Sequence, residues 1–212
     1  MRVFAILLAA VLAGACGAPG ITAASAATAA VGARDVPRGM LRCAASGDMD
    51  TFLKTLSKKD PGSFAKNKAQ WDAAKKAGAI AAEVAIYSDT KADCDAVSVS
   101  TSTQKVPPGT RVLVSYSFQF KDAATAVKAY RDQSIWGIGA ANTPSGGFGT
   151  LAGTGTGLGK NSVAVGLEVG GHGFYVAFWQ NKAFVLILLA ISVAQDQAKQ
   201  VAVSENARID KF

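Results

Sequence analysis

Apolar residues at every second position, or in short unbroken runs, mark five expected β-strands along the chain. These stretches are residues 80–87, 112–120, 163–169, 174–180 and 183–191. Asn181-Lys182 separates the last two, a pair typical of a hairpin turn. The final run is apolar on both faces, which indicates a central strand covered on both sides.

Apolar residues three or four positions apart predict four helices, two before these strands, one between them and one after them. The first helix follows Asp48, a good N-cap, and ends at Pro61-Gly62; a lysine-rich helix covers residues 65–77. A third helix follows Asp122, and Ser192-x-x-Gln195 has the form of a capping box for the last one. The order α-α-β-β-α-β-β-β-α predicts an α+β domain with an antiparallel sheet of about five strands and helices packed on it.

The first residues have a different pattern, typical of an export signal. Arg2 precedes ten apolar residues, too few to span a bilayer, and small residues follow. Leu12-Ala13-Gly14-Ala15-Cys16 resembles a bacterial lipobox, which implies a signal peptide over residues 1–15 and a lipid on Cys16. The chain would then be anchored at the outer face of the cell membrane. Ala13-x-Ala15 also suits an ordinary signal peptidase, which would release a secreted protein.

The following residues divide into an expected tether and a domain. Residues 16–38 are rich in Ala, Gly, Ser and Thr without apolar periodicity, so we expect a flexible tether there. Residues 39–212 form one domain's length. If Cys16 carries lipid, Cys43 and Cys94 remain as an even pair, which predicts a disulfide in an oxidising compartment. By closing this loop, the bond would reduce the entropy of the unfolded chain and stabilise the fold by on the order of 4 kcal/mol.

The chain has a formal net charge of +7, and its lysines concentrate in the first two helices. Between positions 54 and 76 only Asp60 and Asp72 oppose the lysines at 54, 58, 59, 66, 68, 75 and 76. This pattern indicates either a solvated helical face or attraction to anionic lipid or cell-wall polymer. No arginine-aromatic pattern indicates nucleic-acid binding.

The glycine-rich region contains partial matches to two phosphate-binding motifs. Gly159-Lys160 resembles the end of a P-loop, but Thr154 stands where its first glycine belongs and Asn161 replaces the Ser/Thr. The stretch 147–152 matches the dinucleotide fingerprint without the strand before it and the helix after it. We therefore expect no nucleotide cofactor.

Catalytic candidates are few. His172 is the only histidine, no serine elbow accompanies it, and no His/Cys cluster predicts a metal site. Glu83 and Glu168 are the carboxylates that a cell-envelope hydrolase would use, although such residues are usually the hydrated face of a sheet.

Four aromatic residues are the candidate ligand site. Trp136, Phe148, Tyr175 and Trp179 lie in or beside the glycine-rich region, and Tyr175 and Trp179 share one strand face. They would line an apolar groove for a small ligand if no helix covers that face. The alternative is that both rings pack beneath helices.

The order of strands, helix, meander and helix resembles the PsbP/Mog1-like domains of some bacterial lipoproteins, and this resemblance implies binding or accessory work. The sequence thus favours an extracytoplasmic, membrane-tethered lipoprotein with a non-enzymatic binding or sensor-like role. Its expected partner is a small apolar ligand or another component of the envelope. A carboxylate hydrolase and a structural protein that binds envelope polymer are the alternatives.

Overall fold

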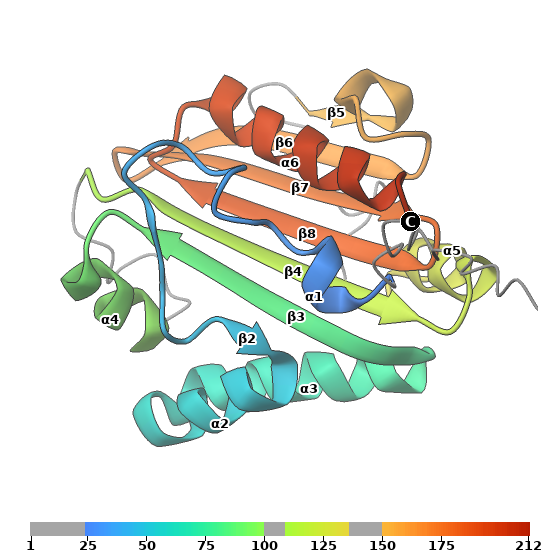
Figure 1. Cartoon of the computed structure of the whole chain (residues 1–212), viewed down its shortest axis with the longest axis horizontal. Coiled ribbons are helices and arrows are strands. Elements are labelled where there is room, and N and C mark those ends of the chain that lie inside the picture. The colour runs from blue at the N-terminus through green and yellow to red at the C-terminus, as the bar shows by residue number, and fades with distance from the viewer. Residues whose placement is uncertain (1–23, 100–108, 136–149) are drawn as a thin grey trace, which may run out of the picture.

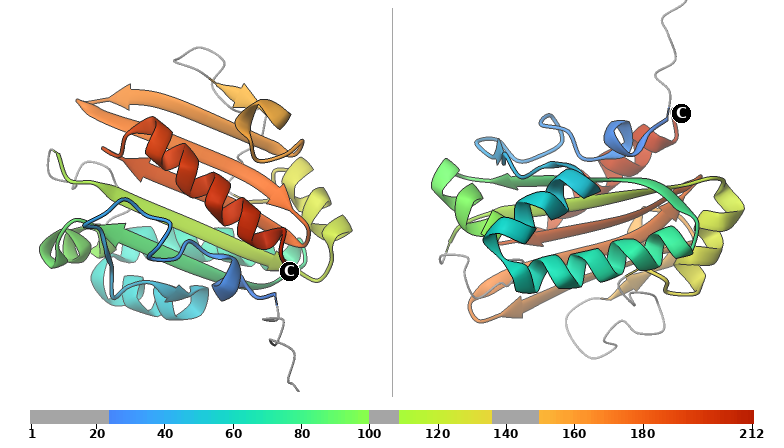
Figure 2. Two further views of the ribbon diagram at one scale, coloured as in Figure 1. Left: turned by 45° about the horizontal axis from the view of Figure 1, so that its top comes forward. Right: turned by 90° about the horizontal axis from the view of Figure 1, so that it is seen from below.

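The computed structural model describes residues 24–99, 109–135 and 150–212 of the 212-residue chain. The expected signal peptide, Cys16, Trp136 and Phe148 lie outside these residues. Within them the chain forms one antiparallel sheet with helices on both faces (Figures 1 and 2). The predicted α+β class is therefore confirmed.

The sheet of the described residues has eight strands rather than the predicted five, in the order β1-β3-β4-β8-β7-β6-β5, with β2 also paired to β3. The five long strands, each near a predicted stretch, are β3 (Ala79–Ser88), β4 (Val112–Phe120), β6 (Ser162–Val169), β7 (His172–Asn181) and β8 (Phe184–Ile191). The additional strands are β1 (Leu41–Arg42), β2 (Gly47–Asp48) and β5 (Leu151–Ala152). Two residues contain no periodicity, so the hydrophobic pattern could not predict these strands.

The strand β8 lies between β4 and β7 in the middle of the sheet. Its side chains are buried on both faces, because a separate hydrophobic core lies on each side. The prediction of a central, doubly covered strand from its unbroken apolar run is confirmed.

Two sets of helices cover the two faces of the sheet. The first face, called here the four-helix face, carries α2 (Met49–Lys59), α3 (Pro61–Lys76), α4 (Lys91–Val99) and α5 (Ala123–Arg131). The second, called the α6 face, carries α1 (Ala26–Ala29) and α6 (Gln195–Ile209). In the left view of Figure 2, α6 crosses in front of the strands while α2 and α3 lie behind them.

Aromatic rings fill the core of the four-helix face. Phe118 of β4 is fully buried, and its ring centroid lies 6.2 Å from that of Trp71 in α3. Tyr130 of α5 stacks on Phe178 of β7 with centroids 4.8 Å apart. Such pairs add directional contacts to the large apolar area that these rings bury.

Aspartates cap the first two helices of this face. Asp48 accepts a hydrogen bond from the backbone nitrogen of Thr51 at 2.9 Å, as expected of an N-cap. Asp60 caps α3 in the same way through Ser63, and Pro61 stands at the first helical position. The second helix therefore begins at Pro61, four residues before the predicted start. The helix α4, which begins two residues after Asp89, was not predicted.

Cys43 and Cys94 form the predicted disulfide, with their Cα atoms 5.2 Å apart. Cys43 follows β1 at the edge of the sheet, and Cys94 lies in α4. The bond therefore ties the start of the domain to the helix that joins β3 and β4.

The segment of residues 24–38 packs on the α6 face instead of forming the expected flexible tether. Val31 is buried, and the hydroxyl of Tyr87 donates to its carbonyl oxygen at 3.0 Å. Arg208 of α6 pairs with Asp35 and donates to the carbonyl oxygens of Ala29 and Ala30. The small side chains that suggested a tether let the backbone lie close to the sheet, so the domain begins before residue 39.

None of the helices in the described ranges is both long enough and apolar enough to cross a membrane.

Candidate ligand-binding pocket

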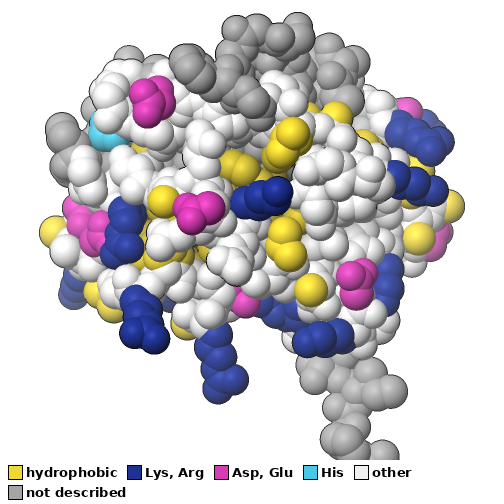
Figure 3. Space-filling model, turned by 90° about the horizontal axis from the view of Figure 1, so that it is seen from above, with side chains coloured by type: hydrophobic (Ala, Val, Ile, Leu, Met, Phe, Trp, Pro, Cys, Tyr) yellow, Lys and Arg dark blue, Asp and Glu magenta, His cyan; other side chains and the backbone are white. Residues whose placement is uncertain are grey.

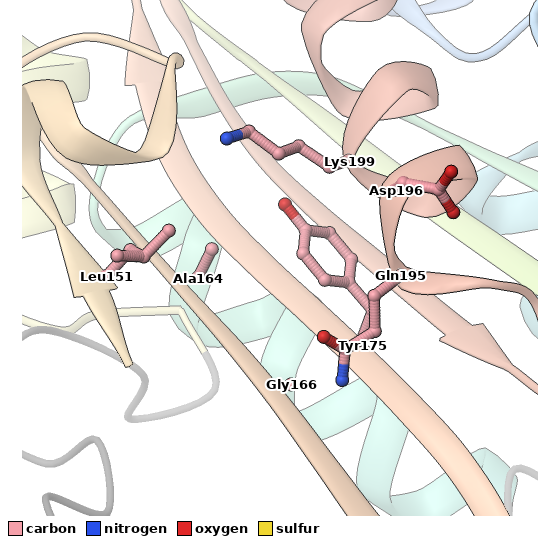
Figure 4. A pocket seen from close by; sticks show the side chains of 7 residues that line it. All are labelled: Leu151, Ala164, Gly166, Tyr175, Gln195, Asp196 and Lys199. Atoms are coloured by element: carbon pink, nitrogen blue, oxygen red, sulfur yellow. The ribbon is translucent and has the colours of Figure 1, made fainter. Parts of the chain in front are cut away.

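A cavity of about 210 Å³ opens on the α6 face between β5, β6, β7 and the start of α6 (Figure 4). Its lining residues are Leu151, Ala164, Gly166, Tyr175, Gln195, Asp196 and Lys199. Figure 3 views the side of the molecule that carries α6 and β5, where apolar side chains are exposed beside basic ones. Leu151 and Val203 are among the large apolar residues exposed at the surface.

Small residues beside Tyr175 create the space. The alternation of β7 places Tyr175 on the α6 face, opposite Gly166 of β6 and Ala190 of β8. A Cβ atom added to Gly166 would lie 2.3 Å from the side-chain nitrogen of Gln195. The amide of Gln195 therefore rests directly on the backbone of β6, and a side chain at position 166 would displace this amide from its present place.

The hydroxyl of Tyr175 is the distinctive polar group of the pocket. The residue is only 6% exposed, and its oxygen has no hydrogen-bond partner among the described residues. Burial raises the pKa of Tyr175 to about 12, so the phenol stays neutral and keeps its proton. In Figure 4 the hydroxyl points toward the side chain of Lys199.

The start of α6 lacks a side-chain cap. Its N-cap is Ala194, which makes no side-chain hydrogen bond, so the predicted capping box of Ser192 and Gln195 is wrong. Ser192 has a positive φ of 55°, and its hydroxyl lies 3.1 Å from Nδ1 of His172. The first turn of α6 therefore presents the positive end of the helix dipole beside the pocket.

One cation and one acid of α6 line the pocket. Lys199 extends over the cavity on the side of the Tyr175 hydroxyl, whereas the carboxylate of Asp196 points away from the ring (Figure 4). Neither residue makes an ion pair within the described ranges. Lys199 thus brings a positive charge to the cavity that no acid of the described residues pairs with.

The four aromatic residues predicted to form a groove are only partly accounted for. Tyr175 lines the pocket, but Trp179 is fully buried beneath α6 and its indole nitrogen has no partner among the described residues. Trp136 and Phe148 lie outside the described residues. Sequence reasoning missed Gln195 and Lys199, which are four positions apart and so share one face of α6.

A buried carboxyl group lies farther along α6. Glu205 is fully buried, and its Oε1 accepts hydrogen bonds from the hydroxyls of Ser115 at 2.8 Å and Ser117 at 3.0 Å. Its Oε2 has no partner in the described part of the chain. Burial raises the pKa of Glu205 to about 8, although the two serine hydroxyls favour the charged form.

The two carboxylates considered for a hydrolase do not meet. Glu83 is on β3 and Glu168 on β6, with three strands between them. At about 4.8 Å per strand their backbones are at least roughly 19 Å apart across the sheet, farther than the pair of carboxyl groups in a glycosidase. Glu83 binds Arg42 at 2.8 Å, burial raises the pKa of Glu83, and Glu168 is exposed.

His172 has the hydroxyl of Ser192 as its neighbour and lies at the turn between β6 and β7. Within the described ranges no group of three His, Cys, Asp or Glu side chains is arranged to hold a metal ion.

A second cavity, of about 320 Å³, has polar walls that already bond to one another. The amide of Asn161 donates to Gln180 at 2.7 Å, and that of Asn181 donates to Asn206 at 2.9 Å. Lys160, from the incomplete P-loop motif, also lines this cavity. Because its amides satisfy each other, the Tyr175 pocket is the better candidate for a ligand site.

Comparison of the chain with protein-family models, with curated proteins and with solved structures finds no match. The candidate site therefore stands on its geometry alone.

Proposed function

We propose that this chain is an extracytoplasmic lipoprotein whose domain binds a small ligand in the Tyr175 pocket. The observation that carries the proposal is a buried hydroxyl, without a partner among the described residues, at the wall of a cavity. A buried polar group without a partner costs about 1–3 kcal/mol. A ligand acceptor at this position removes that cost, so the free protein is already arranged for binding.

The leader pattern and the disulfide support the location. The basic start, short apolar core and Leu12-Ala13-Gly14-Ala15-Cys16 favour export and a lipid on Cys16. The bond between Cys43 and Cys94 persists in oxidising compartments such as the cell exterior. Secretion without the lipid is the alternative.

Binding accounts for the pocket better than catalysis does. The phenol of Tyr175 has a pKa of about 12 and is a poor base at neutral pH. Glu83 and Glu168 are too far apart to act as a pair on one glycosidic bond. The resemblance of the element order to PsbP/Mog1-like domains stays a prediction and points in the same direction.

The first test is mass spectrometry of the full protein purified from its own membrane. We expect a larger mass under native than under denaturing conditions, and loss of the difference in Tyr175→Phe. Tyr130→Phe is the matched control, because Tyr130 is also largely buried but lies on the four-helix face. A ligand that persists in Tyr175→Phe and is lost from Tyr130→Phe would contradict the proposal.

The same sample tests the anchor. We expect the N-terminal peptide to begin at an acylated Cys16, and Cys16→Ser to release the protein into the medium. An unmodified N-terminus in membrane-free protein would replace the lipoprotein proposal with secretion.

A second candidate function uses the lysines of α2 and α3. All seven are exposed, and five of them (54, 58, 59, 66 and 76) form no ion pair within the described ranges. This surface suits contact with anionic lipid or envelope polymer. Binding to anionic vesicles that fails at high salt, and is halved or more by replacing Lys58 and Lys59 with Gln, would support it.

A further inference from the structure

We infer that the ligand of the Tyr175 pocket is a small organic carboxylate. Its carboxylate lies between the Tyr175 hydroxyl and the Lys199 ammonium, and its apolar part faces Leu151 and Ala164. This inference rests on the proposed binding function and specifies the ligand's chemistry.

The Tyr175 hydroxyl and the Lys199 ammonium are two donors on the same side of the cavity (Figure 4). The Tyr175 hydroxyl is buried without a partner in the described part of the chain and points toward Lys199 (Figure 4). The Lys199 side chain makes no ion pair within that part. A neutral O–H donor and an ammonium together fit an oxygen-rich anion, because charge-assisted hydrogen bonds are the stronger ones.

The surrounding charges favour a single negative charge. The uncapped start of α6 places the positive end of its dipole beside the cavity. Asp196 is the only acid among the lining residues, and its carboxylate points away from the ring of Tyr175. One ammonium balances one carboxylate, whereas a phosphate dianion would retain an excess of negative charge.

The size and walls of the cavity limit the rest of the ligand. Its volume of about 210 Å³ exceeds the roughly 150 Å³ of a cavity known to hold benzene. Leu151 and Ala164 supply an apolar wall, and the Gln195 amide supplies a polar group over Gly166, away from the hydroxyl. A carboxylate with about ten non-hydrogen atoms, one side of it apolar, matches these dimensions.

The test compares isosteric probes on the purified full chain by calorimetry. Benzoate carries the charge, benzamide has the same shape without it, and inorganic phosphate has the charge without the apolar part. We expect benzoate to bind at least about tenfold more tightly than either of the others. High salt should weaken benzoate binding and leave benzamide binding unchanged.

Variants assign the contacts. Lys199→Gln should lower the affinity for benzoate about tenfold without changing that for benzamide, and Tyr175→Phe should weaken both. Lys121→Gln, an exposed lysine before α5 with no ion pair in the described residues, should change neither.

The outcomes separate this inference from the proposed function. Equal binding of benzoate and benzamide, or benzoate binding that Lys199→Gln leaves intact, would overturn the carboxylate inference. If no probe binds but the co-purified ligand disappears from Tyr175→Phe, the carboxylate inference fails while the binding function stands. If no probe binds and Tyr175→Phe keeps its ligand, both fail.

Discussion

The two faces of the sheet differ in how completely their buried polar groups are hydrogen-bonded. On the four-helix face the Tyr116 hydroxyl donates to Asn67 at 3.5 Å, and the Asn67 amide donates to the carbonyl oxygen of Ser63 at 2.9 Å. On the α6 face lie the three buried side-chain atoms without a partner that the described residues contain. They belong to Tyr175, Trp179 and Glu205.

Together with the proposed binding function, this difference predicts that the four-helix face supports stability and the α6 face supports ligand binding. The four-helix face combines satisfied polar groups with stacked aromatic rings and lies beside the disulfide, so its interactions hold the fold. The α6 face buries two donors and one carboxyl oxygen without partners, which costs free energy of folding, and such costs are typical of binding surfaces. Perturbing the first face should therefore change stability, and perturbing the second should change ligand binding or the response to pH.

The largest effect is expected for Phe118→Ala on the four-helix face. Removing this fully buried ring leaves a cavity beside Trp71 and should lower the free energy of unfolding by about 4 kcal/mol. Urea denaturation measures the loss, and ligand affinity of the folded fraction should stay unchanged. A loss below about 1 kcal/mol, or a parallel loss of affinity, would mean that the two faces are not separate.

Glu205→Gln should have the next largest effect, and the effect should depend on pH. The pKa of Glu205 is about 8 in the folded protein against 4.5 for an ordinary glutamate. As pH rises above 4.5 the unfolded chain releases a proton that the folded protein retains, so folding becomes less favourable until pH passes about 8. At pH 7 this cost is about 3 kcal/mol, and glutamine, which does not ionise, avoids it.

Denaturation of both proteins across pH measures this difference. The variant should be more stable than the natural protein at pH 7 and about equally stable near pH 4.5. Glu168→Gln, at an exposed carboxylate, is the matched control and should show no such trend. An unchanged difference from acid to neutral pH would show that Glu205 is not held protonated by burial.

Much of the four-helix face follows from the sequence. The alternation of β4 assigns Val114, Tyr116 and Phe118 to one face, and the spacing of apolar residues after Asp48 predicts α2. These signals are local to each element. The orientation of Ile80 cannot be predicted from the alternation of β3, because a register shift between Ala79 and Ala81 turns this side chain outward, where it is 62% exposed.

The α6 face is harder to predict because its surroundings come from distant segments. Ser115 and Ser117 alternate with apolar residues as a hydrated face would, but α6 covers them. One signal was available: Glu205 continues the inner stripe of Ala198 and Ala202 at helical spacing. The pocket itself forms where Gly166, Tyr175 and α6 come together. These residues lie on separate elements, so no spacing pattern along the sequence could have predicted their contact.

The smallest effect tests the comparison most directly, through the same substitution on opposite faces. Tyr116→Phe removes a hydroxyl that bonds to Asn67 and should lower the free energy of unfolding by about 1 kcal/mol. Tyr175→Phe removes a buried hydroxyl without a partner in the described ranges and should raise the free energy of unfolding of ligand-free protein by up to about 1 kcal/mol. Thermal denaturation of the two variants measures both changes.

Adding the ligand should reverse this order for Tyr175→Phe. A ligand that binds only the folded state stabilises the natural protein in proportion to the logarithm of its concentration over Kd. The variant gains less, because the contact with the hydroxyl is missing, and it should become the less stable protein at saturation. If Tyr175→Phe is destabilised as much as Tyr116→Phe without any ligand, its hydroxyl already has a partner in the free protein, and the distinction between the two faces is lost.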